Sequence, residues 1–138
     1  MSVKLTSHVR EVKRNMEQNM KRAATIIGGM AEGYAKGYAP VDTGLLRNSI
    51  TYALGGESPE HLDYKSNDEN ERGSYDSSAP QDAEGQITVY IGTNVQYAPY
   101  QELGAPNVNV PAHPFLRPAI ENHISEYQEV LKRELSRG

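Results

Sequence analysis

The chain has 138 residues, a length that suits one folded domain, and it contains neither cysteine nor tryptophan. Without cysteine it cannot hold a disulfide scaffold, a thiolate metal site or a cysteine nucleophile. No stretch approaches the ~18 apolar residues that span a bilayer, and the first residues lack the continuous apolar run of a secretory signal. These features favour a small soluble domain of a reducing cytoplasm.

The net charge of −4 is unevenly distributed along the chain. Residues 55–85 contain nine acidic and two basic residues, a local balance of −7, while the rest of the chain carries +3. Residues 3–38 contain seven basic and three acidic residues, without the interleaved aromatic side chains of a nucleic-acid-binding surface. We therefore interpret the basic excess as a solvated helix face, and keep a small DNA-binding protein as the alternative from a different functional class.

Apolar and small side chains recur every three or four residues and predict one helix over residues 6–39, capped by Thr6 or Ser7 and ended by Pro40. Four glycines lie in its second half: Gly28, Gly29, Gly33 and Gly37. The last three are spaced by four and share one face. Two interpretations remain open: the helix breaks near Gly28 and Gly29, or the bare stripe lets a sheet or a partner helix approach closely. The apolar rhythm continues through the glycines, which favours the second.

Alternating side chains predict two strands, over residues 49–54 and 86–92. The simplest topology pairs them in antiparallel fashion. Between them, residues 57–85 are rich in Glu, Asp, Ser, Asn and Pro and show no period. Such a composition cannot bury enough surface to offset the entropy of ordering the segment. We therefore expect a flexible acidic insertion that forms an enlarged hairpin loop.

The remaining segments complete an α+β domain that comprises the whole chain, in the order helix, strand, strand, helix. Residues 39–50 predict a turn, in which Asp42 or Thr43 caps a short helical turn. Four prolines within residues 93–114 predict a structured loop without regular pairing. An apolar stripe at helical spacing predicts a terminal helix over residues 115–135.

The sequence carries no recognisable catalytic motif. The histidines lack a zinc-binding spacing, and a nucleophile elbow, a phosphate-binding loop and a dinucleotide fingerprint are missing. Glu102 is an isolated acid in a partly apolar context, which we interpret as a capping residue or as an ion-pair partner of Arg47 or Arg117. His113, between alanine and proline, is interpreted as a loop residue. We expect no catalytic residue, no cofactor and no metal.

Two blocks of sequence resemble a known family. Residues 39–50, APVDTGLLRNSI, are similar to the block APVDTGxLRxSI of small tailed-phage neck proteins. Residues 91–104, IGTNVQYAPYQELG, with the following VPAHPFLRPAI of residues 110–120, resemble the later family block VGTNVxYAPYxExG … PAxPFLRPAL. The family comprises gp10-like neck, head–tail joining or tail completion proteins of siphophages and prophages. Residues 57–85 are longer and more acidic than the family pattern.

The resemblance implies a virion structural subunit without catalysis, which forms a homo-oligomeric, hexameric ring at the head–tail interface around the DNA channel. The implied partners are the head connector or head-closure protein and the tail tube or tail terminator protein. DNA would pass through the lumen without specific binding, and no membrane is involved. The implied location is the virion neck or tail, after assembly in the cytoplasm of the host bacterium. A tail terminator ring is the alternative within the structural class.

The resemblance also implies which positions serve assembly. The residues carried over from the two blocks are Val41, Asp42, Thr43, Gly44, Leu46, Arg47, Gly92, Tyr97, Tyr100, Glu102, Gly104, Pro111, Pro114, Phe115, Arg117 and Pro118. Among them, we expect Gly44 to adopt a positive φ at a tight turn. Arg47, Glu102 and Arg117 are expected to form a charge-paired clasp. For Tyr97 and Tyr100, an interface and the core are both open as locations.

Overall fold

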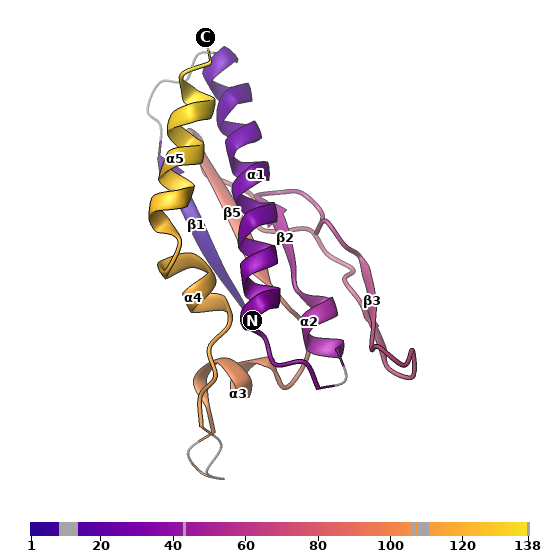
Figure 1. Cartoon of the computed structure of the whole chain (residues 1–138). Coiled ribbons are helices and arrows are strands. Elements are labelled where there is room, and N and C mark those ends of the chain that lie inside the picture. The colour runs from indigo at the N-terminus through magenta and orange to yellow at the C-terminus, as the bar shows by residue number, and fades with distance from the viewer. Residues whose placement is uncertain (9–13, 43, 106, 108–110, 138) are drawn as a thin grey trace.

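The computed structural model describes residues 1–8, 14–42, 44–105, 107 and 111–137. It confirms the α+β class: helices pack on one face of a small antiparallel sheet (Figure 1). The described helices are α1 (Arg14–Tyr38), α2 (Leu45–Ser49), α3 (Ala98–Leu103), α4 (Leu116–Glu121) and α5 (Ile124–Leu135). The described strands are β1 (Ser2–His8), β2 (Thr51–Leu54), β3 (Asp63–Lys65), β4 (Arg72–Ser74) and β5 (Gln86–Gly92).

The main sheet has the strand order β1-β5-β2 and is antiparallel throughout. The predicted pairing of the two strands is confirmed: Thr51 lies opposite Gly92, and Leu54 lies opposite Val89. β5 is the central strand, and its alternation places Val89 and Ile91 on the buried face.

The predicted start of the first helix is wrong. Residues 6–8 belong to strand β1, whose seven residues pair with β5 from Ser2 opposite Gly92 to His8 opposite Gln86. The described helix begins only at Arg14, and the part of the prediction that covers residues 9–13 lies outside the described residues. Pairing with a distant strand overrides the local periodicity, and a single sequence does not display that partner.

Helix α1 runs without a break through its glycines, so the interpretation that it breaks near Gly28 and Gly29 is wrong. The close approach occurs at Gly28, where an added Cβ would lie 2.3 Å from Cδ2 of Tyr52 in β2. The stripe of Gly29, Gly33 and Gly37 is different, because an added Cβ at each position would meet open space. This chain's own sheet therefore requires the first glycine and leaves the stripe bare.

The core forms where α1 lies on the sheet beside α4 and α5. Its buried residues are Ala23, Ile27, Ala31, Ala35, Ala39, Leu45, Leu46, Ile50, Ile91, Val95, Ala98, Phe115, Leu116, Ala119, Tyr127 and Val130. The helix contributes mostly alanine, whose small side chain lets its axis approach the sheet closely. The larger side chains come from the partners, above all Phe115 and Ile91. α1 and α5 run side by side in opposite directions (Figure 1).

The expectation of an acidic segment without regular structure is also wrong, because residues 57–85 contain the two-stranded sheet of β3 and β4. The Tyr64 ring covers Gly73 on the opposite strand, where an added Cβ would lie 2.2 Å from the Tyr64 hydroxyl. A small sheet of this kind is held by tyrosine contacts and by hydrogen bonds to the body, which amino-acid composition does not reveal. We call residues 57–85 the acidic arm.

Two further expectations need correction in the second half of the chain. The loop predicted over residues 93–114 contains the helix α3, with Pro99 in its first turn, where proline is tolerated. The terminal helix predicted over residues 115–135 is divided into α4 and α5. The division falls at His123, whose ring stacks on Tyr34 of α1 with the ring centroids 3.5 Å apart. This contact with α1 stabilises the turn between α4 and α5.

Candidate assembly surface

The two sequence blocks meet at one end of the molecule, around α2 and α3 (Figure 1). A buried pair of hydroxyl groups joins them: Ser49 Oγ and Thr93 Oγ1 lie 2.6 Å apart. Ser49 also donates to the Leu46 carbonyl at 2.6 Å, which uses its single proton, so Thr93 donates to Ser49. Thr93 Oγ1 in turn accepts the Val95 N–H at 3.1 Å. The blocks are thus one structural unit.

The turn of the first block depends on Gly44. This residue has φ +82°, as predicted, and it precedes α2 as its N-cap. An added Cβ would lie 2.3 Å from Oδ1 of Asn67 in the acidic arm, a side-chain end that can move aside, so the positive φ is what requires glycine here. The predicted cap from Asp42 or Thr43 is not found: the N-cap position is Gly44 without a side-chain cap, and Thr43 lies outside the described residues.

The second block opens at the central strand and holds the arm. At Gly92, an added Cβ would lie 2.5 Å from the Met1 carbonyl oxygen, so β1 requires glycine there. Asn94 then anchors the arm: its Nδ2 donates to the Ser74 carbonyl at 2.8 Å, and its Oδ1 accepts the Tyr64 hydroxyl. Its backbone N–H also donates to the Tyr75 hydroxyl at 3.2 Å.

Glu102 is a capping residue, one of the two roles that its sequence context suggests. Its buried carboxylate accepts the backbone N–H groups of Phe115, Leu116 and Arg117 at 3.0, 2.7 and 3.3 Å. These are orphan donors at the start of α4, where a negative charge also complements the helix dipole. Glu102 thereby joins α3 to α4.

The predicted charge-paired clasp is not found. Within the part of the chain that the structure describes, Glu102 forms no ion pair with Arg47 or Arg117. The Arg117 side chain instead lies 3.7 Å from Glu121 one turn later in α4, and the Arg47 side chain is exposed. The carboxylate is satisfied by backbone donors, so neither arginine is needed to neutralise it.

The other block residues divide by burial. Leu46 and Phe115 are buried in the core, and Gly104 ends α3 with φ +79°. Pro111 and Pro114 are exposed, and Pro118 is half-buried in the first turn of α4.

Four apolar side chains of the blocks and of α3 remain exposed at this end. The exposed fractions are 54% for Val41, 43% for Tyr97, 60% for Tyr100 and 64% for Leu103. For Tyr97 and Tyr100, these fractions exclude the core of the chain as their location. We call these four residues the apolar tip.

A groove of about 340 Å³ lies beside the apolar tip. Its wall includes Val41 and Tyr97, and polar groups come from Asp42, Gln101 and, on the acidic arm, Glu71. The motif turn, α3 and the arm therefore contribute to one continuous concave surface. The groove combines aromatic and aliphatic side chains with polar groups, a composition that is typical of protein interfaces.

The turn of the acidic arm carries stabilised negative charge. The hydroxyl of Ser66 donates to Asp68 at 2.6 Å and, with the Asn70 N–H, lowers the pKa of that carboxyl. Lys65 donates to Glu69 at 2.6 Å and lowers its pKa. Both carboxyl groups therefore stay ionised to a lower pH than an unperturbed carboxyl group does. The arm is rich in acidic residues, and these hydrogen bonds also stabilise the ionised form of two of them.

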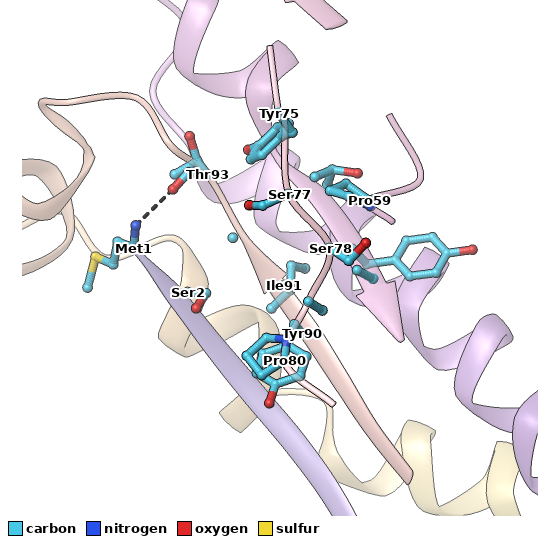
Figure 2. A pocket seen from close by; sticks show the side chains of 15 residues that line it. Met1, Ser2, Pro59, Tyr75, Ser77, Ser78, Pro80, Tyr90, Ile91 and Thr93 are labelled. Atoms are coloured by element: carbon cyan, nitrogen blue, oxygen red, sulfur yellow. Dashed lines mark hydrogen bonds between the residues drawn. The ribbon is translucent and has the colours of Figure 1, made fainter. Parts of the chain in front are cut away.

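A second cavity, of about 210 Å³, lies between the sheet and the arm (Figure 2). In Figure 2 the arm residues Ser77, Ser78 and Pro80 pass over the sheet, and they line the cavity together with Tyr90 and Ile91. The cavity is lined by hydroxyl, aromatic and aliphatic groups, and its lining side chains include no carboxylate, imidazole, amine or guanidinium.

The described residues contain no cluster of three or more His, Asp or Glu side chains that would suit a metal ion. Over the same residues, no helix combines the length and the apolar character that a membrane crossing needs.

Three residues of this end were missed as site residues: Ser49, Thr93 and Asn94. All three lie within the two blocks, and the signal that would identify them is a small polar residue next to a strand end, where a buried backbone group needs a partner.

Comparison with known proteins supplies the family. Residues 1–104 match a family model described as "Bacteriophage HK97-gp10, putative tail-component". The match includes both main blocks, from β1 to the end of α3, and it stops before α4 and α5. No curated protein and no solved structure matches the chain. The match spans well over half of the sequence, and the chain belongs to the HK97-gp10-like family of bacteriophage tail components.

Proposed function

We propose that this tail component is a neck protein, which completes the head–tail junction as a homo-oligomeric ring around the DNA channel. In this role the subunit has no catalytic task. It binds copies of itself, a connector or head-closure protein on the head side, and the tail tube or terminator on the other side. Its location is then the virion, after assembly in the bacterial cytoplasm, and the ring is expected to be a hexamer.

The observation that carries this proposal is the exposure of the apolar tip. Several block residues have a clear task within the single chain: Gly44 makes the turn, Glu102 caps α4 and Phe115 fills the core. The side chains of Val41, Tyr97, Tyr100 and Leu103 expose 43–64% of their surface. Grouped apolar side chains of this size at one end of a small domain favour association with another protein.

The chemistry of the tip fits a protein partner better than a small substrate or DNA. Tyrosine combines a large apolar ring with a polar hydroxyl, which suits an interface that is also exposed to water during assembly. Asp42 and Glu71 add negative charge to the adjoining groove, which repels DNA phosphates. We therefore place protein contacts, and not DNA contacts, at this end.

The acidic arm allows two arrangements in the ring. If it faces the lumen, its negative charge repels packaged DNA and keeps the channel free of adhesion. If it faces outward, it forms a solvated flap against the neighbouring head or tail proteins. Neutralising Asp68, Glu69 and Glu71 together by amide substitution separates the two. The lumen arrangement predicts slower DNA ejection with intact particles, whereas the outward arrangement predicts weaker docking of neighbouring proteins.

Substituting exposed residues of the apolar tip with a polar residue tests the proposal. Tyr100→Ser and Leu103→Ser should leave folding unchanged because both side chains are more than half exposed. Both should reduce ring formation, measured by light scattering of the purified protein alone and with its connector. Ile124→Ser is the matched control, since Ile124 is 47% exposed on α5 and lies outside the tip. Its ring formation should equal that of the unmodified chain.

Complementation of a phage lacking this gene gives the second measurement. Neck failure predicts filled heads and complete tails that do not join. Tails of irregular length would instead support the alternative of a tail terminator. Virions that contain no copies of the chain, or tip variants that assemble and infect normally, would contradict the proposal.

A further inference from the structure

Three arginine side chains gather around one buried carboxylate where α1 begins and α5 ends. Glu134 in the last turn of α5 is 2% exposed. Guanidinium nitrogen atoms of Arg22 on α1, of Arg133 on α5 and of Arg137 lie 3.8, 3.6 and 3.5 Å from its oxygen atoms. Three guanidinium groups and one carboxylate leave a net charge of +2. We call Arg22, Arg133 and Arg137 the arginine cluster.

The arginine cluster keeps N–H donors for a further acceptor. Its three N···O distances are longer than those of hydrogen bonds, and over the described residues the Oε2 atom of Glu134 has no hydrogen-bond partner. One nitrogen of Arg22 donates to Asn19 at 3.3 Å, and a guanidinium group has further N–H donors. The three side chains are also 50–59% exposed. The cluster can therefore bind a carboxylate from outside the chain.

The groove beside the apolar tip has the opposite chemistry. Its lining includes the exposed residues Asp42 and Glu71, and none of the lining residues that the structure describes is Lys, Arg or His. Tyr97 adds an aromatic ring to the same wall. A guanidinium group pairs with a carboxylate through parallel hydrogen bonds and stacks on aromatic rings. The groove is therefore suited to an arginine side chain.

The two surfaces lie at opposite ends of the molecule. Figure 1 shows the start of α1 and the end of α5 at one end, and α2 and α3 at the other. One chain therefore cannot bring its own arginine cluster and groove together. Each end also exposes apolar surface, since Met16 in the first turn of α1 is 42% exposed and the other end carries the apolar tip.

We propose that the arginine cluster of one copy binds the groove beside the apolar tip of the next copy. This inference rests on the proposed ring and names the two surfaces that join its subunits. The occupant of the groove is a second copy because the chain carries the complementary charge at its other end. A ring needs two different surfaces on each subunit, and this pair supplies them. Contact between two clusters or between two grooves would instead set like charges against each other.

Reversing the charges of one surface at a time tests the contact. The groove variant carries Asp42→Arg and Glu71→Arg, and the cluster variant carries Arg133→Glu and Arg137→Glu. Either variant alone sets like charges against each other in every contact of the ring. We expect the protein concentration at half-assembly, measured by light scattering with and without the connector, to rise about tenfold or more for each.

An equimolar mixture of the two variants should assemble again. The reversed cluster then meets the reversed groove, and the unmodified cluster meets the unmodified groove, in a ring where the variants alternate. The concentration at half-assembly should return to within about threefold of that of the unmodified chain. Such an alternating ring closes only with an even number of subunits, as in the expected hexamer.

Two further sets of variants keep the test independent of folding and of net charge. Arg137→Gln leaves Arg22 and Arg133 beside the buried Glu134, and it should still raise the concentration at half-assembly about threefold or more. Lys4→Glu and Glu84→Arg are the matched controls, since both residues are exposed and lie outside the cluster and the groove lining. Both controls should assemble like the unmodified chain. Circular dichroism checks the fold of every variant.

The contact is overturned if both reversed variants form rings like the unmodified chain, or if their folded mixture stays unassembled. If Tyr100→Ser still disrupts those rings, the ring proposal survives and only this contact fails. Normal rings of a cluster variant that no longer binds the connector, or no longer retains a double-stranded DNA probe, would assign the cluster to that partner and also overturn the contact. An unmodified chain that forms no ring with or without its connector would contradict the proposed function itself.

Discussion

Ser49 Oγ and Thr93 Oγ1 are buried and lie 2.6 Å apart, although 44 residues separate them along the chain. Ser49 lies near the end of the first sequence block and Thr93 near the start of the second, so their hydrogen bond is a point at which the two family motifs meet. The acidic arm is inserted between these two positions, and Tyr75 of the arm returns to donate to the Ser49 carbonyl at 2.7 Å. The motifs therefore form the frame from which the arm and the apolar tip extend.

Removing either hydroxyl should destabilise the fold. Thr93→Val keeps the shape of the side chain but leaves the Val95 N–H and the Ser49 oxygen without their partner, which should lower the free energy of unfolding by about 1–3 kcal/mol. Ser49→Ala should cost a similar amount. In urea unfolding, the double variant should lose less than the sum of the two single variants. Purely additive losses would show that the two hydroxyls act independently.

The capping role of Glu102 gives a second prediction. Glu102→Gln retains one oxygen but turns an NH₂ group toward the N–H donors at the start of α4, and we expect a loss of about 1.5–3 kcal/mol in the free energy of unfolding. Arg117→Ala is the control, because its pair with Glu121 is exposed and contributes at most about 0.5 kcal/mol. A larger effect at Arg117 than at Glu102 would restore the charge-paired clasp.

The contact between α1 and α5 should respond to acid. The hydroxyl of Tyr34 donates to Glu126 and lowers the pKa of its carboxyl, and the His123 ring, with Nδ1 3.3 Å from Glu126, acts in the same direction. A lowered pKa in the folded state stabilises the fold above the ordinary carboxyl range near pH 4, and this contribution is lost as the pH falls through the folded pKa. Thermal unfolding between pH 7 and pH 2.5 should therefore show a smaller acid-induced fall in Tm for Glu126→Gln. Glu129→Gln, on the same helix, should keep the full decrease.

Docking of the acidic arm should respond to alkali. Burial raises the pKa of Tyr75 to about 12, although the nearby Thr93 side chain and the N–H of Asn94 act in the opposite direction. The neutral phenol is thus favoured in the folded state, and its contribution to stability is lost as the pH rises from about 10 toward 12. Tyr75→Phe should remove one late step from the tyrosine absorbance titration. It should also speed hydrogen exchange at the Asn94 N–H; unchanged exchange there would show that the hydroxyl does not hold the arm.

The parts of the fold that follow from local pattern were predictable. Strand β5 and its partner β2 show plain alternation, and Gly44 stands at a turn that only a positive φ can close. The parts that depend on a distant partner were not. The strand at Ser2–His8 exists because β5 lies beside it, and the break at His123 exists because Tyr34 provides a stacking surface.

The site shows the same division. The capping role of Glu102 follows from its isolation in an apolar context, but the identity of its partners does not, because backbone donors carry no sequence signal. The arm was misjudged for a related reason: its average composition is that of a disordered segment, whereas three specific contacts of Tyr64, Tyr75 and Asn94 hold it in place.

The glycines of α1 provide the last prediction, because neighbouring positions should respond in opposite directions. Gly28→Ala forces a Cβ to within 2.3 Å of the Tyr52 ring, so β2 must shift and the free energy of unfolding should fall by about 1–3 kcal/mol. Gly33→Ala meets open space and should raise it by about 0.5–1 kcal/mol, since alanine is the better helix former. Urea unfolding of both variants measures the difference. If Gly33→Ala stabilises the monomer yet reduces the yield of assembled particles, the bare stripe lies against another subunit; if particle yield is unchanged, the stripe remains open to solvent in the assembly.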